Sequence, residues 1–465
     1  MTEQTADLAG CLAALGGIAG LPLSTALAVR EQHGRDISHH HPRPPDAVVY
    51  PRSREDVVAI VNICRTHRVP IIAYGTGTSL EGHIAAPRGG ICLDVSAMNA
   101  ILAVNESDLD AVVQPGVTRK TLNEHLRATG LFFPIDPGAD ASIGGMTGTR
   151  ASGTNAVRYG TMRENVLALE VVTADGRVIR TGSRARKSSA GLDLTRLFVG
   201  SEGLLGIFTE VTVRLYGIPE MIAAASCAFP LLEGAVNTTI ATIQSGIPIA
   251  RMELLDDVQV EAINRYAKLD LPPGNTLLME FHGSTAGVEE QAKAVQEIAR
   301  QEGGAAFRWS ARPEDRTRIW QARHDAVWAN QQMRPGWAMW PTDVCVPISQ
   351  LADCILATKA DIEAEQLFAP VLGHVGDGNF HLTIFFDPAD PAALARVEAL
   401  NERLVRRALG AQGTCTGEHG IGLGKMKFMR EEHGEAVDAM IAIKRALDPD
   451  NIFNPGKMLG PIGNQ

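Results

Sequence analysis

The stretch Pro134–Gly160, PIDPGADASIGGMTGTRASGTNAVRYG, is the part of the sequence that most restricts the fold. It consists almost entirely of glycine, alanine and hydroxyl side chains, and it has neither the helical nor the strand period of apolar residues. A helix predicted at Thr118–Thr129 and a strand predicted at Leu167–Thr173 flank it, which argues against disorder. We therefore predict a long loop whose backbone approaches a ligand closely. A flexible surface loop is the alternative.

A second segment of small residues, Gly75–Ser79, follows a short buried strand predicted at Val69–Ala73. Consecutive N–H groups in such a turn can point into one concavity and bind a phosphate. The spacing matches neither the Rossmann fingerprint nor the Walker A loop, because no Lys-Ser/Thr pair follows the glycines. A tight turn without a ligand is an equally good interpretation of this motif alone.

A third glycine-rich segment, Phe198–Ile207, precedes a strand predicted at Phe208–Tyr216. Apolar and polar residues alternate along that strand, which predicts that one face is exposed. Upstream, Ser53 and Asp56 resemble a capping box at the start of an amphipathic helix. The first half of the chain therefore carries three small-residue loops on short strands and helices.

The second half has the alternating pattern of a further α+β domain with an antiparallel sheet. Strands are predicted at 223–229, 249–254, 276–282 and 305–309, and helices at 233–245, 287–302 and 390–411.

Composition restricts the class of protein and its partners. A chain of 465 residues should form two or three domains, and a net charge of −10 disfavours nucleic acid as a partner. Seven scattered cysteines without a C-x-x-C pair indicate reduced thiols and an intracellular protein. The uncharged stretch Leu8–Val29 is interpreted as neither a membrane span nor a signal peptide, because Glu3 and Asp7 precede it and glycine, proline and hydroxyl residues dilute it.

Two polar segments near the C-terminus, Gly373–His381 and Thr416–Gly422, concentrate ionisable groups among glycines. His374, His381 and Glu418 are the ligand types of a three-ligand metal site with an open position. The alternative is a set of hydrogen-bonded loop histidines, because the His-x6-His spacing is not specific.

Two further residues complete the candidate chemistry. If the metal is bound, His419 is left as a base beside it, since imidazole titrates in the range needed to remove a hydroxyl proton. Arg323 can clamp a carboxylate with two hydrogen bonds. A surface position is the alternative for this arginine.

Segments that carry a family resemblance span nearly the whole chain after residue 30. The chain resembles the flavoproteins of the vanillyl-alcohol oxidase and p-cresol methylhydroxylase type, and within them the D-lactate dehydrogenase (cytochrome) and D-2-hydroxyacid dehydrogenase branch. The matching segments are PRSREDVVAIVNICRTHRVPIIAYGTGTSLEG, QPGVTRKTLNEHL, PIDPGADASIGGMTGTRASGTNAVRYGTMRENV, FVGSEGLLGIFTEVTVRL, RPGWAMWPTDVCVPIS, GHVGDGNFH, CTGEHGIGLGKMKFM and LDPDNIFNPGKML.

The resemblance implies an α+β fold with a two-part FAD-binding domain and a ferredoxin-like antiparallel-sheet cap domain for the substrate. The expected boundaries are an N-terminal helical segment at 1–41, the FAD-binding domain at 42–219, the cap domain with the metal site at 220–449, and a tail at 450–465 that returns to the FAD-binding domain.

The resemblance also implies non-covalent FAD. The residues expected to hold its pyrophosphate are Gly75, Thr76, Gly77, Thr78, Ser79, Pro137, Gly138, Ser142, Gly144 and Gly145. Those expected along the flavin are Thr149, Ser152, Gly153 and Gly160, with Gly203 and Ile207 towards the adenine and Asn454 contributed by the tail.

The implied reaction is oxidation of a D-2-hydroxy acid, either D-lactate or an acid with a longer apolar side chain, to a 2-oxo acid. His374, His381 and Glu418 would bind zinc or manganese, His419 would take the hydroxyl proton, and Arg323 would hold the substrate carboxylate. The hydride would pass to flavin N5, and the electrons to an external acceptor: a cytochrome, a quinone or an electron-transfer flavoprotein. The expected location is the cytoplasm, or the surface of a membrane that holds the acceptor.

The sequence departs from the relatives that oxidise D-2-hydroxyglutarate. Those enzymes carry Asn where this chain has Thr383 and a Lys near the position of Pro341. Trp337, Met339 and Trp340 suggest an apolar substrate pocket, although a place in the core fits them equally well.

Several alternatives stay open at this point. They are a glycolate-oxidase-type subunit, a D-2-hydroxyglutarate dehydrogenase, and a non-catalytic flavin- or metal-binding module. The substrate side chain, the metal, the electron acceptor and the oligomeric state, a homodimer included, also stay open.

Overall fold

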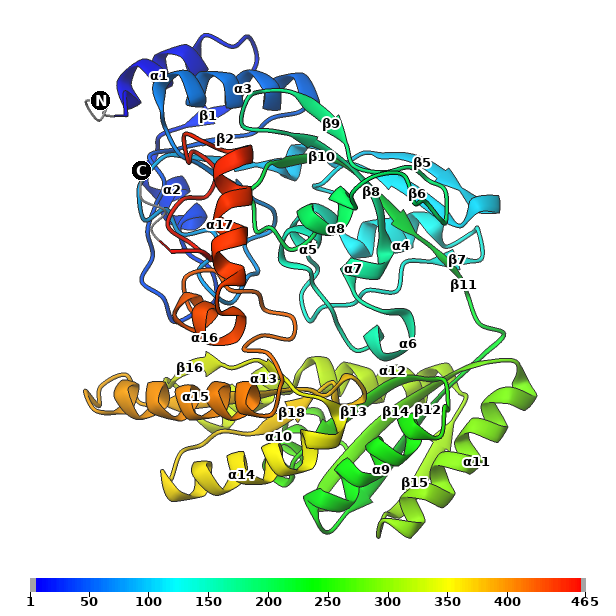
Figure 1. The fold of residues 1–465 in the computed structure, drawn as a ribbon. Coiled ribbons are helices and arrows are strands. Elements are labelled where there is room, and N and C mark those ends of the chain that lie inside the picture. Colours follow the sequence, from blue (N-terminus) through cyan, green and yellow to red (C-terminus); the bar gives the residue numbers. More distant parts are fainter. Residues whose placement is uncertain (1–5, 461–465) are drawn as a thin grey trace. The chain divides into compact units, whose positions relative to one another are not determined.

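The computed structural model of this chain describes residues 6–460. The chain divides into two compact units, which Figure 1 draws as a ribbon. Among the described residues, the first unit holds 6–152, 161–217 and 418–460, and the second holds 153–160 and 218–417. This division differs from the expected boundaries, because 418–449 lies with the first unit and 153–160 lies with the second.

The first sheet of the first unit has four short strands in the order β1-β2-β4-β3. The strands β2 and β3 run parallel to β4, and β1 runs antiparallel to β2. Their bounds are β1 (Leu23–Ser24), β2 (Ala47–Val49), β3 (Ile71–Tyr74) and β4 (Ile91–Asp94).

The helix α3 (Arg54–His67) forms as the sequence predicts. It begins at Ser53, whose hydroxyl accepts a hydrogen bond from the Asp56 N–H at 3.1 Å. Its buried residues recur at helical spacing, and α1 (Leu8–Gly16) packs on it. The helix is thereby fixed just before β3, the strand that leads into the predicted phosphate loop.

The second sheet of the first unit is antiparallel, in the order β5-β6-β10-β8-β9. The predicted alternation along 208–216 is confirmed in part. On the polar face of β10, Glu210 and Arg214 are half-buried rather than fully exposed, and Thr212 between them is buried, while α3 packs on this strand. The bounds are β5 (Ile101–Asn105), β6 (Asp110–Val113), β8 (Val166–Val172), β9 (Val178–Arg180) and β10 (Ile207–Arg214).

The stretch 134–160 is not a continuous loop, which corrects the prediction for its secondary structure. It contains α5 (Ile143–Thr149) and α6 (Ala156–Tyr159). The hydroxyl of Ser142 accepts a hydrogen bond from Gly145 N–H at 3.2 Å and starts α5. The apolar period is missing because glycine and threonine also face the protein interior in this helix.

The sheet of the second unit is antiparallel throughout, in the order β15-β12-β14-β13-β18-β19-β16, with β17 paired to β19. Its first four strands have the ferredoxin-like order, as predicted. The bounds are β12 (Met221–Phe229), β13 (Ile249–Leu255), β14 (Asn275–Gly283), β15 (Ala305–Ser310), β16 (Ala338–Pro341), β17 (Val344–Cys345), β18 (Val371–Gly373) and β19 (Asn379–Phe386).

Two groups of helices cover this sheet. The helices α9 (Leu232–Gln244) and α11 (Thr285–Gln301) contact each other and the strands β12 and β14. Residues of α10 (Asp257–Ala267), α12 (Pro313–His324) and α13 (Ala326–Met333) form a separate apolar cluster with Leu255 and Leu278. The remaining long helices are α14 (Leu351–Ala364) and α15 (Ala393–Gly410).

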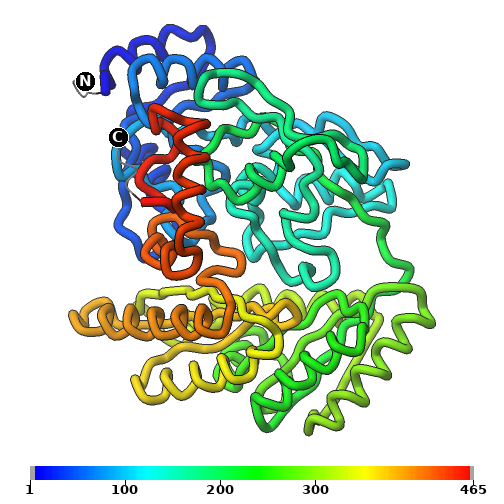
Figure 2. The backbone as a smooth tube through the Cα atoms, in the orientation of Figure 1, coloured from blue at the N-terminus to red at the C-terminus, as the bar shows by residue number. Residues whose placement is uncertain are grey.

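The C-terminal segment returns to the first unit. In Figure 2 it is the red end of the tube, beside the blue N-terminal part. Phe453 forms a parallel bridge with Ile71 in β3, and the buried Lys444 of α17 (Ala436–Leu447) donates hydrogen bonds to Leu204 O at 2.8 Å and Phe453 O at 2.9 Å.

The shorter elements connect these parts. They are α2 (Leu27–His33), α4 (Arg119–Leu126), β7 (Leu131–Phe132), α7 (Met162–Asn165), α8 (Leu194–Phe198), β11 (Tyr216–Gly217) and α16 (Met429–His433). Between residues 6 and 460, no helix combines the length and the apolar composition that a bilayer crossing needs. All seven cysteines are free thiols.

Candidate active site

The loop 75–79 directly follows β3 and leaves backbone N–H groups available to a ligand. Among the described residues, none accepts a hydrogen bond from the backbone N–H groups of residues 76–79. Gly77 has φ +69°, a conformation that glycine adopts without strain. Four consecutive N–H groups without protein acceptors fit the pyrophosphate of FAD.

The loop 75–79 lies against the start of α5, so the first two predicted cofactor segments come together. A Cβ added at Gly75 would lie 2.5 Å from Ser142 Oγ and 3.5 Å from the Gly145 Cα. A Cβ at this position would therefore displace the Ser142 hydroxyl, which caps α5. The contact lies wholly within the first unit and joins residues that are far apart in the sequence.

The glycines of the second segment have different roles. Gly144 N–H donates to Pro115 O at 2.8 Å, and a Cβ here would lie 2.5 Å from Pro115 Cβ, so Gly144 serves close packing. Gly138 is exposed, next to the half-buried Pro137, and no atom lies within 4 Å of its Cβ position. Gly138 therefore presents open backbone to a ligand, whereas the Gly144 N–H is already used.

The residues expected along the flavin lie at the end of α5 and around α6. Thr149 Oγ1 donates to Gly145 O at 3.2 Å, and Ser152 is half-buried. Gly153 and Gly160 have φ +149° and +75°. They bound the short segment that belongs to the second unit.

The third segment and the tail meet beside β3. Asn454 N–H donates to Ile71 O at 2.8 Å, and its side-chain amide donates to Glu202 O at 2.6 Å. Gly203 has φ +74°, and a Cβ here would lie 3.4 Å from the Cβ of Ala73. Ile207 is buried at the start of β10. The predicted adenine-side residues and Asn454 are thus brought together.

Glu202 is a buried residue that sequence analysis missed. Its carboxylate accepts hydrogen bonds from Ile421 N–H at 2.7 Å and Gly422 N–H at 2.9 Å, and lies 3.2 Å from His83 Nε2. Burial opposes its ionisation, but His83 and the two N–H groups hold the pKa of Glu202 below its usual value. The sequence signal that could have revealed Glu202 is its position among the glycines of GSEGLLG.

Lys457 is a second buried ionisable group in the first unit. Its ammonium donates to Asn454 Oδ1 at 2.5 Å and to His83 O. Burial lowers the pKa of Lys457 to about 7. This lysine therefore ties the tail to the segment around His83.

His374 and Arg323 are joined by a carboxylate in the second unit. His374 follows β18, and its Nδ1 lies 2.6 Å from Glu253 Oε1. Arg323, near the end of α12, donates from Nε to Glu253 Oε2 at 2.8 Å. Burial opposes ionisation, yet His374 and Arg323 lower the pKa of Glu253. The surface alternative for Arg323 is excluded, since its exposed fraction is 9%.

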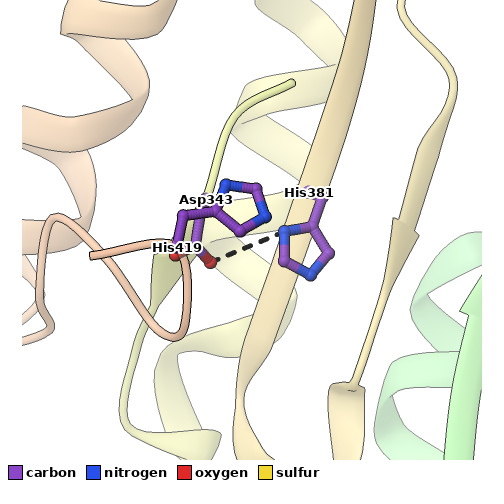
Figure 3. Close-up of side chains that lie close together, drawn as sticks. All are labelled: Asp343, His381 and His419. Carbon is purple, nitrogen blue, oxygen red and sulfur yellow. Dashed lines mark ion pairs between the residues drawn. The ribbon is translucent and has the colours of Figure 1, made fainter. Parts of the chain in front are cut away.

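His381 lies on β19 rather than in a loop and contacts a second buried carboxylate, Asp343 (Figure 3). Its Nδ1 is 3.5 Å from Asp343 Oδ1 and 3.1 Å from Thr342 O. Asp343 also accepts hydrogen bonds from the Asn379 amide and the Thr416 hydroxyl, both at 2.7 Å. It thereby holds the strand of His381 to the segment that precedes Glu418.

The structure brings one possible ligand atom of each predicted metal ligand together. One ligand atom each from His374, His381 and Glu418 lies within 4.8 Å of the others, and Glu418 is bonded directly to Gly417. Asp343, His381 and His419 form a second such group. Two imidazoles and a carboxylate are a donor set suited to zinc or manganese, so these residues fit a divalent ion.

His419 lies in the loop that follows Glu418 and is held within the first unit. Its Nδ1 lies 3.9 Å from Glu81 Oε1, and Lys425 Nζ lies 3.4 Å from the same oxygen. Glu202 accepts hydrogen bonds from the backbone of Ile421 and Gly422, which follow shortly after. Two buried carboxylates, Glu81 and Glu202, therefore contact the loop that carries this imidazole.

The family is decided by two matches that together cover most of the chain. Residues 45–182 match the FAD binding domain, and residues 218–458 match the C-terminal domain of FAD linked oxidases. The chain belongs to the FAD-linked oxidase family. The FAD-dependent enzyme class inferred from the sequence is confirmed.

The relatives include dehydrogenases and an oxidase subunit. The chain is 54% identical to "Probable D-lactate dehydrogenase, mitochondrial" of Danio rerio, with 94% of this chain and 89% of the relative covered. It is 48% identical to "D-lactate dehydrogenase [cytochrome], mitochondrial" of Arabidopsis thaliana, with 94% and 78% covered. It is 36% identical to "Glycolate oxidase subunit GlcD" of Bacillus subtilis, with 93% and 92% covered. The resemblance to the D-lactate dehydrogenase branch is thereby confirmed.

Solved structures confirm the predicted fold class. The fold is similar to that of p-cresol methylhydroxylase with substrate bound, at a TM-score of 0.77 and 18% identity, with 95% of each chain covered. It is also similar to that of 4-ethylphenol oxidase from Gulosibacter chungangensis, at a TM-score of 0.75 and 20% identity, with 94% of each chain covered.

The close approach at Gly75 gives a first testable prediction. Gly75→Ala should push the loop 75–79 away from Ser142 and weaken FAD binding at least about tenfold, a loss of roughly 1.4 kcal/mol. The FAD content of purified protein and reconstitution of the apoprotein measure this effect. Gly16→Ala is the matched control, because no atom lies within 4 Å of its Cβ position in α1. Equal FAD affinity in wild type and Gly75→Ala would contradict the assignment of this loop.

Proposed function

We propose that this FAD-linked oxidase oxidises D-2-hydroxy acids, D-lactate foremost, to 2-oxo acids with the help of a divalent metal ion. The observation that carries the proposal is the group formed by His374, His381 and Glu418, with Arg323 linked to His374 through one carboxylate. A metal beside a carboxylate-binding arginine suits a substrate that carries a hydroxyl next to its carboxylate.

The chain's own residues supply binding, orientation and proton transfer. FAD, when bound, accepts a hydride, and the ion bound by the two histidines and Glu418 would polarise a substrate oxygen. Arg323 holds the substrate carboxylate, which fixes the orientation of the α-carbon. His419 removes the hydroxyl proton as the α-hydrogen leaves. The residues of the loops 75–79 and 137–145, with Asn454, hold the cofactor.

The sheet favours a substrate without a distal carboxylate. Pro341 and Thr383 are paired across β16 and β19, and Thr383 lies on the same side of its strand as His381. The positions that differ from the D-2-hydroxyglutarate enzymes are therefore neighbours, and neither supplies a cation. Met339 is half-buried on the same face of β16 as Pro341, which adds apolar surface nearby, whereas Trp340 lies on the opposite face of the strand.

This substrate preference can be tested by changing both positions. Thr383→Asn combined with Pro341→Lys should raise kcat/KM for D-2-hydroxyglutarate by about 10- to 100-fold, because a hydrogen bond to a charged group contributes roughly 1.5–3 kcal/mol. Steady-state kinetics with both acids measure it. Each single change is the control and should give a smaller gain. An unchanged ratio of the two kcat/KM values would place the side-chain pocket elsewhere.

The decisive test of the reaction is anaerobic reduction of the bound flavin. The visible flavin absorption should bleach with D-lactate and not with L-lactate, and chelation of the metal should stop the bleaching. Bleaching with glycolate only after addition of further subunits would favour a glycolate-oxidase-type subunit, which the relative from Bacillus subtilis makes the second candidate. Stable yellow protein that bleaches with none of these acids would indicate a binding module without turnover.

The electron acceptor and location are part of the same proposal. Three relatives, among them the protein of Arabidopsis thaliana, are named for a cytochrome, which supports a cytochrome as the acceptor. Reoxidation of reduced protein by cytochrome c, a quinone or an electron-transfer flavoprotein distinguishes the candidates. The location expected from the sequence is the cytoplasm or a membrane surface, and cell fractionation tests it. Light scattering tests the homodimer.

A further inference from the structure

We infer that Glu253 is a positioning residue that sets both the metal ligand His374 and the substrate-binding Arg323, one with each carboxylate oxygen. The inference rests on the proposed function and adds a residue that the sequence analysis did not consider. Glu253 lies within β13, its exposed fraction is 0%, and neither partner is close to it in sequence.

The first contact fixes the orientation of His374. Glu253 Oε1 lies 2.6 Å from His374 Nδ1, so Nδ1 carries the proton and donates it in this hydrogen bond. The ligand atom offered to a metal is then Nε2. A carboxylate behind a ligating imidazole fixes its tautomer and ring orientation and increases its basicity. Glu253 should therefore strengthen metal binding without touching the ion.

The second contact selects which edge of Arg323 meets the substrate. Glu253 Oε2 accepts from Nε at 2.8 Å and lies 2.7 Å from Nη2. In the range 6–460, no residue accepts a hydrogen bond from Nη1 of Arg323. The side of the guanidinium that carries Nε is thus held by the protein, while its Nη1–Nη2 end stays available for two hydrogen bonds to a carboxylate.

The same sheet contains a matched arrangement that does not include a predicted metal ligand. Glu280 on β14 is buried. Its Oε1 lies 2.7 Å from His282 Nε2 and 3.5 Å from Arg251 Nε. His282 uses its other nitrogen in a contact of 2.7 Å with the Tyr159 hydroxyl. A Glu280→Gln variant is therefore a control. It shows how much stability is lost when a buried Glu–His–Arg group is disturbed at a place without a predicted metal ligand.

The amide of Glu253→Gln can satisfy only one of the two partners. Its oxygen can accept the His374 or the Arg323 hydrogen bond, and its NH2 group then faces a donor. Metal binding and binding of the substrate carboxylate should consequently both weaken. Glu253→Asp keeps the charge but shortens the side chain by one methylene, so it should retain part of both functions.

The experiment compares wild type with Glu253→Gln, Glu253→Asp and Glu280→Gln as FAD-loaded full-length proteins. Mn²⁺ affinity is measured by EPR titration of metal-depleted protein, KM for D-lactate at saturating Mn²⁺, and thermal stability separately. We expect Glu253→Gln to weaken Mn²⁺ binding about 10- to 100-fold and to raise KM by at least about tenfold. Glu253→Asp should fall between it and wild type. Glu280→Gln should lower the melting temperature and leave Mn²⁺ affinity and KM within about twofold of wild type.

Two results would overturn the inference separately from the proposed function. Glu253→Gln, or Glu253→Asp if the former does not fold, with wild-type Mn²⁺ affinity and KM rejects the role of Glu253 alone. Equal losses in Glu280→Gln would also reject it, because the effect would then be structural. Wild-type protein that binds no Mn²⁺ and oxidises no D-lactate overturns the proposed function, and this inference with it.

Discussion

His419→Ala should give folded, yellow protein whose flavin is reduced by D-lactate about 10²- to 10⁴-fold more slowly than in wild type. The proposed function assigns this imidazole the substrate hydroxyl proton, and alanine cannot accept it. The loop itself should keep its place, since Glu202 binds the backbone N–H groups of Ile421 and Gly422 and not the His419 side chain. Anaerobic stopped-flow absorbance measures the rate, and FAD and metal content confirm that the site is loaded.

His433→Ala is the control for this experiment. His433 is an exposed histidine at the end of α16 in the same unit, so its removal should leave flavin reduction unchanged. Added imidazole should restore part of the activity of His419→Ala by replacing the missing base. A rate within about threefold of wild type in His419→Ala would remove this residue from proton transfer, whatever the outcome of the metal analysis.

The cofactor-binding loops could be predicted from the sequence, because positions without room for a Cβ appear in it as glycines. Gly75 and Gly144 stand where a Cβ would strike Ser142 or Pro115, so the sequence must keep the smallest residue there. Periodicity also located most strands and helices of both units. It failed within 143–149, where small residues leave no apolar period although the segment is helical.

The buried carboxylates of the site could not be predicted in the same way. Glu253 lies in RMELL and Asp343 in PTDVC, short segments in which one acidic residue resembles an exposed position. Their roles arise only when β13 and β18 are neighbours and β17 pairs with β19. Arg323 was singled out by its chemistry, but its buried pairing with Glu253 depends on the packing of α12. Tertiary contacts over long sequence separations carry that information.

Glu202→Ala should lower the free energy of unfolding by about 3–5 kcal/mol, because it removes one partner of a buried ion pair. His83 would lose its counter-charge, and the N–H groups of Ile421 and Gly422 would lose their acceptor. The loop that carries His419 would then be released from the first unit, so kcat should fall as well. Chemical denaturation and steady-state kinetics measure the two effects.

The pH dependence of stability in Glu202→Gln separates the contribution of the negative charge of Glu202 from that of its hydrogen bonds, because glutamine has a similar shape but no charge. The pKa of Glu202 is lowered in the folded protein: burial opposes this shift, but His83 and the two N–H groups outweigh it. A carboxyl with a lowered pKa contributes stability that is present above its unfolded pKa and is lost as the pH falls through the folded value. The stability difference between wild type and Glu202→Gln should therefore be largest near neutral pH and shrink below about pH 4.3, the ordinary range of a glutamate. A difference that stays constant from neutral to acid pH would mean that Glu202 holds the loop by hydrogen bonding alone, without a contribution from its charge.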